Sequence, residues 1–359
     1  SQDWADYLRE GPEGSKGARL RTSPGNMLPI ETMSGFYEAG DMRVNEQVAL
    51  TALHTVFVRE HNRLVSKLEA MLPDADEEDR YQWARKVVGA EMQVITYNEF
   101  LPALMGLDAP KASDYRYDDR LDPSVANAFS TALYRLGHSM LSPDLLLLES
   151  DGHQAGTLPL RDAFFTPEFY TSQPDHGDKR LAQVLRGLSM QQAQEIDNKV
   201  IEDVRNFLFG EPGMGGMDLP ALNIQRGRDH GLPDYNTLRE AYELPRVTDF
   251  SQITLDATIQ ALLESLYGNV DNIDGWVGAL AEDHRESSSL GELMTAAMVD
   301  QFVRLRDGDR FFYVGDSDLV GLDVAALFDM GGSGDSAMMR TFDSPSSFHL
   351  DDVTLSAII

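Results

Sequence analysis

The sequence contains no cysteine, and it is short of basic side chains and of long apolar runs. Without cysteine the chain has no disulfides, no thiolate metal ligands and no thiol nucleophile. No apolar run reaches the roughly 18 residues that a bilayer-spanning helix needs, so no membrane partner is expected. With 30 Lys and Arg against 59 Asp and Glu, the net charge of −29 repels phosphate backbones, so nucleic acid is not an expected partner either.

The sequence does contain helical patterns, in a chain whose composition is ordinary for a folded protein. Apolar residues recur at helical spacing between Glu46 and Leu68, which predicts a long buried helix. A second long helix is predicted to start after the acidic residues at 76–79 and to end near Pro102. The expected fold is mainly α, a single large helical domain over residues 1–359 with very little β. Its expected parts are an irregular lead-in (1–40), a core (41–315) and a C-terminal extension (316–359).

Three local patterns predict shorter elements. The Asp-Pro pair at 122–123 suits the cap and first turn of a helix that runs to Met140. The Ser and Gln of a capping box at 189–192 predict a helix over residues 191–209. The run RFFYV at 310–314 is the best strand signal.

Three histidines lie on predicted helices. His138 follows Arg135 by three residues, which places both on one helical face. A lone histidine at the end of an apolar helix is more often a hydrogen-bonded core residue than a metal ligand. His54 and His61 are seven residues apart and lack the i, i+4 spacing of a helical zinc site, so we interpret them as structural.

Arg43 and Glu46 stand directly ahead of the first long helix. A plain interpretation is available for both. Asn45 would cap the helix, Glu46 would favour the positive end of its dipole, and Arg43 would be solvated.

The segment 218–236 concentrates polar residues. Asn223 and Arg226 are three residues apart and can share a helical face, while Asp229 and His230 can pair. The plain interpretation is a polar turn stabilised by its own ion pairs.

Taken together, six stretches resemble the animal-type haem peroxidases of the peroxidase–cyclooxygenase superfamily. They follow the order of that family from about residue 36 to residue 313, which covers most of the chain. The absence of cysteine is more similar to a bacterial member than to the disulfide-bearing metazoan enzymes. The stretches are AGDMRVNEQVALTALHTVFVREHNRL, ARKVVGAEMQVITYNEFLPALMG, YRLGHSML, LPALNIQRGRDHGLPDYN, YGNVDNIDGWVGALAE and QFVRLRDGDRFFY.

The resemblance implies a haem b cofactor and a role for each residue around it. His138 matches the proximal ligand of the iron. Asn223 matches the asparagine that accepts a hydrogen bond from the other ring nitrogen. Arg135 and Arg226 match the arginines that pair with the haem propionates.

The resemblance also assigns the residues ahead of the first long helix. Arg43 matches the distal catalytic arginine, which stabilises negative charge as the peroxide O–O bond separates. Glu46 matches the glutamate that forms an ester with a haem methyl group in many members. The next residue is Gln47 where some members have a methionine joined to a haem vinyl, so that link is not expected.

The distal histidine of the family is not found in this chain. In the family it lies in an upstream Asp-His-Asp segment, whereas no histidine precedes His54 here. We expect this segment to belong to the same gene product, either as a separate N-terminal chain or as a piece absent from this one. Calcium, if bound, would use residues upstream of this chain. Family habit and acidity favour a secreted protein.

The resemblance therefore predicts a haem peroxidase that uses hydrogen peroxide to oxidise a small reductant. The candidate reductants are a halide, thiocyanate, a phenol and Mn(II). The alternative from another class is a haem-binding or adhesive module without useful turnover. A helical scaffold without haem is the third interpretation, and it leaves the matches at 43, 138 and 223 as coincidences.

Overall fold

The computed structural model describes residues 2–11, 16–172, 177–211, 213–320, 350 and 353–358. The prediction of a mainly α fold is confirmed, and the described residues form only two small antiparallel sheets, β1–β2 and β3–β4. None of the helices in these ranges is long and apolar enough to cross a membrane. The chain divides into two compact units, unit 1 (Ser1–Ile95, Asp144–Gln191 and Asp316–Ile359) and unit 2 (Thr96–Pro143 and Gln192–Gly315). A single domain over the whole chain stays a prediction.

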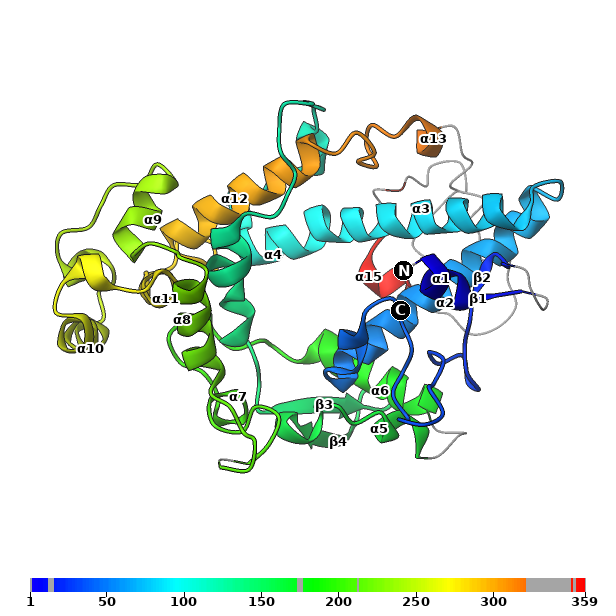
Figure 1. Ribbon diagram of the computed structural model, residues 1–359, viewed down its shortest axis with the longest axis horizontal. Helices are drawn as coiled ribbons and strands as arrows, with labels where there is room; N and C mark the ends of the chain where they lie inside the picture. Colours follow the sequence, from blue (N-terminus) through cyan, green and yellow to red (C-terminus); the bar gives the residue numbers. More distant parts are fainter. Residues whose placement is uncertain are drawn as a thin grey trace. The chain divides into compact units, whose positions relative to one another are not determined.

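Unit 1 combines two long helices with a hairpin and shorter helices (Figure 1). Its described elements are α1 (Gln2–Tyr7), β1 (Arg9–Glu10), β2 (Arg19–Leu20), η1 (Met42–Asn45), α2 (Val48–Met71), α3 (Glu77–Ile95), β3 (Asp144–Leu148), β4 (Gln154–Pro159), η7 (Leu160–Asp162), α5 (Glu168–Thr171), α6 (Gly177–Met190), α13 (Ser317–Val320) and α15 (Leu355–Ile358).

Unit 2 is built from short helices and one long one, α12. Its described elements are η2 (Thr96–Phe100), α4 (Leu101–Met105), η3 (Gly106–Asp108), η4 (Ala112–Asp114), η5 (Phe129–Leu133), η6 (Arg135–His138), α7 (Glu202–Arg205), α8 (Leu219–Asp229), α9 (Tyr235–Ala241), η8 (Phe250–Gln252), α10 (Ala257–Tyr267), η9 (Val270–Asn272), α11 (Gly275–Ala281) and α12 (Glu292–Asp307).

The first long helix forms as predicted, but its cap differs. α2 begins at Val48, and the side chain of Gln47 accepts a hydrogen bond from the Ala49 N–H at 2.6 Å. The Asn45 amide does not cap this helix, because it is buried and bonds both the N–H and the carbonyl of Tyr37 at 2.8 Å. α2 then packs against α3 along the core of unit 1.

The predicted helix over 191–209 is wrong. The preceding helix, α6, ends at Met190, and only α7 forms within the predicted range. The side chain of Gln191 binds the backbone of β3 instead of a helix turn. Its Nε2 donates to the Asp144 carbonyl at 2.7 Å, and its Oε1 accepts from the Leu146 N–H at 2.9 Å. Neither α6 nor the β3–β4 hairpin against which α6 packs was predicted from the sequence.

α6 approaches β3 so closely that only glycine fits at the contact. A Cβ atom at Gly187 would lie 1.6 Å from the carbonyl oxygen of Leu146. The glycine therefore costs helix propensity but permits the packing of α6 on the hairpin.

The helix predicted from 122–123 to Met140 starts later, at residue 127. Side chains of α12 hold the backbone of the intervening residues in an irregular path. Gln301 Nε2 donates to the Ser124 carbonyl at 3.2 Å, and Gln301 Oε1 accepts from the Ala126 N–H at 2.8 Å. Arg304 Nη1 donates to the Asp122 carbonyl at 2.9 Å.

The predicted strand over 310–314 is also wrong. Its backbone forms turns, closed by hydrogen bonds from Phe312 N–H to the Asp309 carbonyl and from Gly315 N–H to the Phe312 carbonyl. Phe312 and Tyr313 are buried in the core of unit 2, at 1% and 5% exposed, whereas Phe311 is 55% exposed.

A buried acid lies between α2 and α3. Glu91 of α3 is fully buried, and neither of its carboxylate oxygens meets a hydrogen-bond donor among the described residues. Burial and, to a lesser extent, the adjacent Glu60 carboxylate raise the pKa of Glu91 to about 9, while Arg63 opposes this rise. A protonated Glu91 can donate to Glu60, whose two oxygens are bound by Arg63.

Replacing Glu91 with glutamine is expected to stabilise the protein at alkaline pH. Between the ordinary glutamate pKa of 4.5 and about 9, the folded state holds a proton that the unfolded chain releases. Stability is therefore fully present below pH 4.5 and falls by about 1.4 kcal/mol per pH unit above it. A glutamine keeps the donor to Glu60 without this cost.

Urea unfolding at pH 6 and pH 8 measures the effect. The wild-type protein should lose stability between these two values, and the Glu91→Gln protein should lose much less. Asp79→Asn on the exposed face of α3 is the matched control and should leave the pH dependence unchanged. If the free energy of unfolding changed equally with pH in all three proteins, Glu91 would be ionised in the folded state.

Candidate functional site

His138, which the resemblance assigns to the iron, lies on a 3₁₀ turn directly after a π-helix. η5 is a π-helix, and after Tyr134 the chain continues as the 3₁₀ turn η6, Arg135–His138. Side chains three residues apart eclipse each other in a 3₁₀ helix. The predicted shared face of Arg135 and His138 is therefore produced by a 3₁₀ turn rather than by an α-helix. The indole of Trp276 donates to the Arg135 carbonyl at 3.3 Å and ties this turn to α11.

Asn223 joins Arg135 and His138 through its side-chain amide. It lies on α8, whose N-terminus is capped by Asp218, and it is fully buried. Its Nδ2 lies 2.8 Å from His138 Nδ1, and its Oδ1 accepts from Arg135 Nη1 at 3.2 Å. The amide thus faces the ring with its donor group. The family resemblance implies the opposite direction, with the asparagine accepting.

The surroundings keep the imidazole neutral. Burial and, to a lesser extent, the Arg135 charge lower the pKa of His138 to about 4, while the bond to Asn223 opposes this fall. A neutral imidazole is the form that binds a metal. For Nε2 to bind an iron, the ring proton must sit on Nδ1, which requires the Asn223 amide to present its Oδ1 to the ring, as the family resemblance implies.

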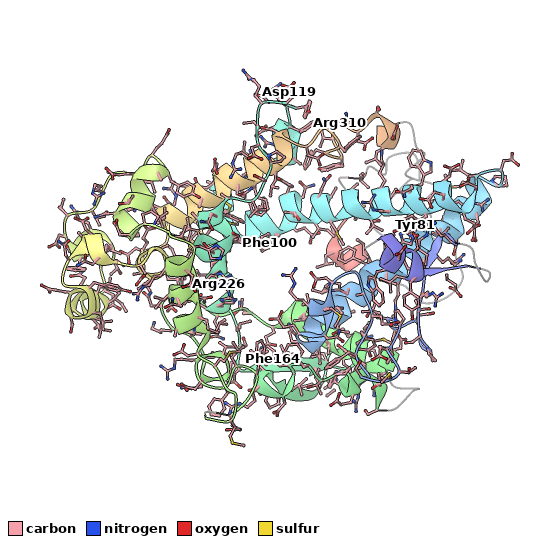
Figure 2. The ribbon with its side chains drawn as sticks, in the orientation of Figure 1. Tyr81, Phe100, Asp119, Phe164, Arg226 and Arg310 are labelled. Atoms are coloured by element: carbon pink, nitrogen blue, oxygen red, sulfur yellow. The ribbon has the colours of Figure 1, made fainter. Side chains whose placement is uncertain are left out.

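Two guanidinium groups beside the histidine have no carboxylate partner among the described residues. Arg226 lies one turn after Asn223 on α8 and is exposed (Figure 2). Burial lowers the pKa of Arg135, and the nearby charge of Arg226 lowers it further. In a chain with a net charge of −29, two adjacent unpaired cations suit the carboxylates of an anionic cofactor. The residues of unit 2 therefore fit a haem with its propionates.

Arg43 and Glu46 lie in unit 1, on and directly after the turn η1. The Arg43 side chain is 78% exposed and is held by Asp41, with Nε 3.0 Å and Nη2 2.5 Å from its carboxylate. The hydrogen bonds from Arg43 hold the pKa of Asp41 down at about 2. Glu46 is half-buried, and its backbone carbonyl accepts from the Phe165 N–H at 3.1 Å.

Several polar residues make contacts other than those predicted for them. Asp229 and His230 do not pair, because Asp229 accepts from Gln225 at 2.6 Å and His230 Nδ1 lies 3.1 Å from Asn127 Oδ1. Two residues that contact the site were not predicted: Asp41, which binds Arg43, and Trp276, which binds the Arg135 carbonyl. The Asp-x-Arg spacing at 41–43 is a signal for the first of these.

The remaining histidines on α2 make local contacts. His54 Nδ1 lies 2.9 Å from the Leu50 carbonyl, and His61 Nε2 lies 2.9 Å from the Ala18 carbonyl. In the part of the chain that the structure describes, no group of three His, Asp or Glu side chains is placed to hold a metal ion.

Comparisons with known proteins place this geometry in a family. The profile of the family "Animal haem peroxidase" matches residues 1–320. Peroxinectin A from Dictyostelium discoideum is 38% identical over 288 residues, which are 80% of this chain and 52% of that protein. Myeloperoxidase from Mus musculus is 38% identical over 286 residues, covering 77% of this chain and 39% of that protein. The chain thus spans about half or less of the length of these relatives.

Solved structures agree with this assignment. Peroxidase A from Dictyostelium discoideum superposes with a TM-score of 0.78 at 33% identity, covering 89% of this chain and 63% of that one. A fatty acid alpha-dioxygenase from Oryza sativa superposes with a TM-score of 0.70 at 19% identity, covering 87% of this chain and 56% of that one, which shows a shared fold alone. On the family profile and these similarities, the chain belongs to the animal haem peroxidase family.

Proposed function

We propose that this chain is the haem-binding part of a peroxidase that uses hydrogen peroxide to oxidise a small reductant. The candidate reductants are a halide, thiocyanate, a phenol and Mn(II). The observation that carries the proposal is the buried contact between Asn223 and His138, beside two guanidinium groups that have no carboxylate partner among the described residues. Bound haem b supplies an iron centre at which peroxide can be reduced by two electrons.

The residues of unit 2 hold and orient the cofactor in this proposal. His138 Nε2 binds the iron while Asn223 fixes the ring through Nδ1. Arg135 and Arg226 pair with the propionates, for which a planar fork of N–H donors is suited.

Two residues of unit 1 have roles in this proposal. Arg43 stabilises the negative charge that develops as the O–O bond separates, since its guanidinium retains N–H groups beyond those that Asp41 holds. Glu46 is the candidate for an ester with a haem methyl group.

Proton transfer between the peroxide oxygens needs a further base. We propose that a distal histidine on a separate N-terminal chain, or on a segment that this chain lacks, supplies it. Any calcium would be bound by residues of that same segment. We further propose an extracellular location, which the acidity of the chain supports.

The test is the optical spectrum of the haem-loaded full-length protein before and after addition of peroxide. We expect a Soret band that shifts on addition of peroxide, together with oxidation of guaiacol that is lost in Arg43→Ala. Arg120→Ala is a matched control, because Arg120 is also exposed and is also held by an aspartate two residues earlier, Asp118. It should keep guaiacol oxidation.

Two results would contradict the proposal. A chain that takes up no haem would remove the cofactor altogether. A Soret band that peroxide does not move in the full-length protein would favour the haem-binding module without useful turnover.

A further inference from the structure

A continuous series of aromatic rings crosses the core of unit 2. We define it as the aromatic chain, in the order Tyr134, Phe302, Tyr97, Phe312 and Tyr115. The successive ring centroids are 6.2, 6.1, 5.1 and 5.2 Å apart. Such distances are those of rings in direct edge or tilted contact. Electronic coupling falls steeply with distance, so rings in contact offer a much better route for an electron than a saturated gap does.

One end of the aromatic chain lies beside the histidine that is placed to bind haem. Tyr134 directly precedes Arg135 and the turn that ends at His138. Its ring is 41% exposed and also stacks on Phe129, with centroids 4.6 Å apart and an interplanar angle of 15°.

The other end directly precedes, in the sequence, the residues that line a hollow at the surface of unit 2. Tyr115 is half-buried, and its hydroxyl donates to the Asp309 carbonyl at 3.0 Å. The residues that follow it, Arg116–Leu121, line a hollow of about 530 Å³ together with Asp307. Tyr117 on this rim is 49% exposed, and Asp119 lies at the tip of the same loop (Figure 2).

The hydroxyl groups divide the tyrosines into two kinds. Tyr97 is buried, its hydroxyl donates to the Phe302 carbonyl at 2.6 Å, and burial raises its pKa. A backbone carbonyl does not take up a proton, so Tyr97 can serve only as a bridging ring. The Tyr115 hydroxyl also donates to a carbonyl, but Tyr115 is half-buried and Tyr134 is exposed, so water can take the phenolic proton when either is oxidised.

We propose that the hollow is a second oxidation site, for phenolic groups on molecules too bulky to reach the cofactor. The aromatic chain conducts electrons from these phenols to the cofactor. This inference rests on the proposed peroxidase function. Each of two phenols loses one electron and one proton, and one hydrogen peroxide takes up two electrons and two protons to give two waters. The products are two phenoxyl radicals.

The charges of the hollow favour a neutral phenol over a halide or another anion. Three aspartates face two arginines there. Asp118 is held by Arg120, whereas Asp119 is exposed and makes no hydrogen bond within the described residues. Its carboxylate can accept the proton that a phenol loses on oxidation.

The test places an oxidant at the cofactor position without peroxide. The full chain is loaded with zinc protoporphyrin IX and illuminated with a cobalt(III) ammine as electron acceptor, so that the porphyrin becomes a one-electron oxidant. Radicals are captured with 2-methyl-2-nitrosopropane and located by mass spectrometry. We expect adducts on Tyr115 or Tyr117 that fall to the level of the porphyrin-free chain in Tyr97→Leu. Tyr97→Phe keeps the bridging ring and should retain the adducts.

A second variant guards against misfolding of Tyr97→Leu. Tyr115→Phe keeps the ring and its packing but removes the oxidisable hydroxyl. In the haem-loaded full-length protein with peroxide, it should lose most oxidation of a phenol tethered to dextran and leave the oxidation of free guaiacol unchanged.

The outcomes separate the two proposals. Adducts confined to Tyr134, adducts unchanged in Tyr97→Leu, or equal loss of both reductants in Tyr115→Phe would overturn the second oxidation site and leave the peroxidase proposal standing. If His138 bound neither haem nor zinc protoporphyrin IX, the peroxidase proposal itself would be overturned.

Discussion

Replacing His138 with alanine is expected to abolish specific haem binding. The ring is the only described group of the site that can offer a neutral nitrogen to iron, and its Nδ1 is fixed by a fully buried amide. Loss of a partner of a metal ligand typically costs about 10–100-fold in affinity, and loss of the ligand itself should cost more. Haem titration followed at the Soret band measures this, and added imidazole should restore part of the band by entering the space left by the side chain.

Two further variants make the His138 experiment specific. Asn223→Leu has a similar volume and should reduce affinity by about 10–100-fold without abolishing binding. His153→Ala removes a histidine whose side chain is 85% exposed and should have no effect. Unchanged haem binding in His138→Ala would mean that the iron is ligated by another residue.

Replacing Arg239 with methionine is expected to destabilise unit 2 by about 3–5 kcal/mol. Arg239 and Glu282 form a buried ion pair at 2.6 Å, with each side chain only 4% exposed. Burial raises the pKa of Glu282, and hydrogen bonds from the Tyr235 hydroxyl, the Leu293 N–H and Arg239 oppose this rise. Without Arg239 the carboxylate must remain buried without its charge partner or take up a proton.

The measurement is urea unfolding followed by the fluorescence of Trp276, in a background where Trp4 and Trp83 are phenylalanine. Trp276 is then the one tryptophan of the chain and lies in unit 2. Arg246→Met is the control, because Arg246 also joins two carboxylates but at the surface, so little change is expected.

A double variant tests the cause. Adding Glu282→Gln to Arg239→Met should recover part of the lost stability, since the unpaired charge is removed. If Arg239→Met were no more harmful than Arg246→Met, the buried pair would not contribute to the stability of unit 2.

The long helices were predictable because their signals are local. The apolar spacing between Glu46 and Leu68 belongs to one helix and needs no distant partner to be recognised. The segment 122–126 was not predictable in the same way. Its backbone is held by Gln301, more than 170 residues away, and no local pattern reports such a bond. Gln191 likewise bonds to β3 rather than beginning a helix.

The candidate site was predictable in its residues but not in its geometry. Spacing alone places Arg135 near His138 and Asn223 near Arg226, but nothing in it joins the two pairs. The family resemblance joined them and implied the bond between Asn223 and His138, and the structure adds the 2.8 Å separation of the two side-chain nitrogens. Asp41 was overlooked because an aspartate two residues before an arginine is ordinary in a turn.

The π-helix η5 has a consequence for how the histidine is aimed. A π turn holds one more residue than an α turn, so η5 amounts to an α-helix with a one-residue insertion. Each residue of an α-helix rotates the chain by about 100°. Excising one residue between Phe129 and Leu133 would restore the common helical pitch and swing the imidazole away from α8, although every side chain of the site would still be present.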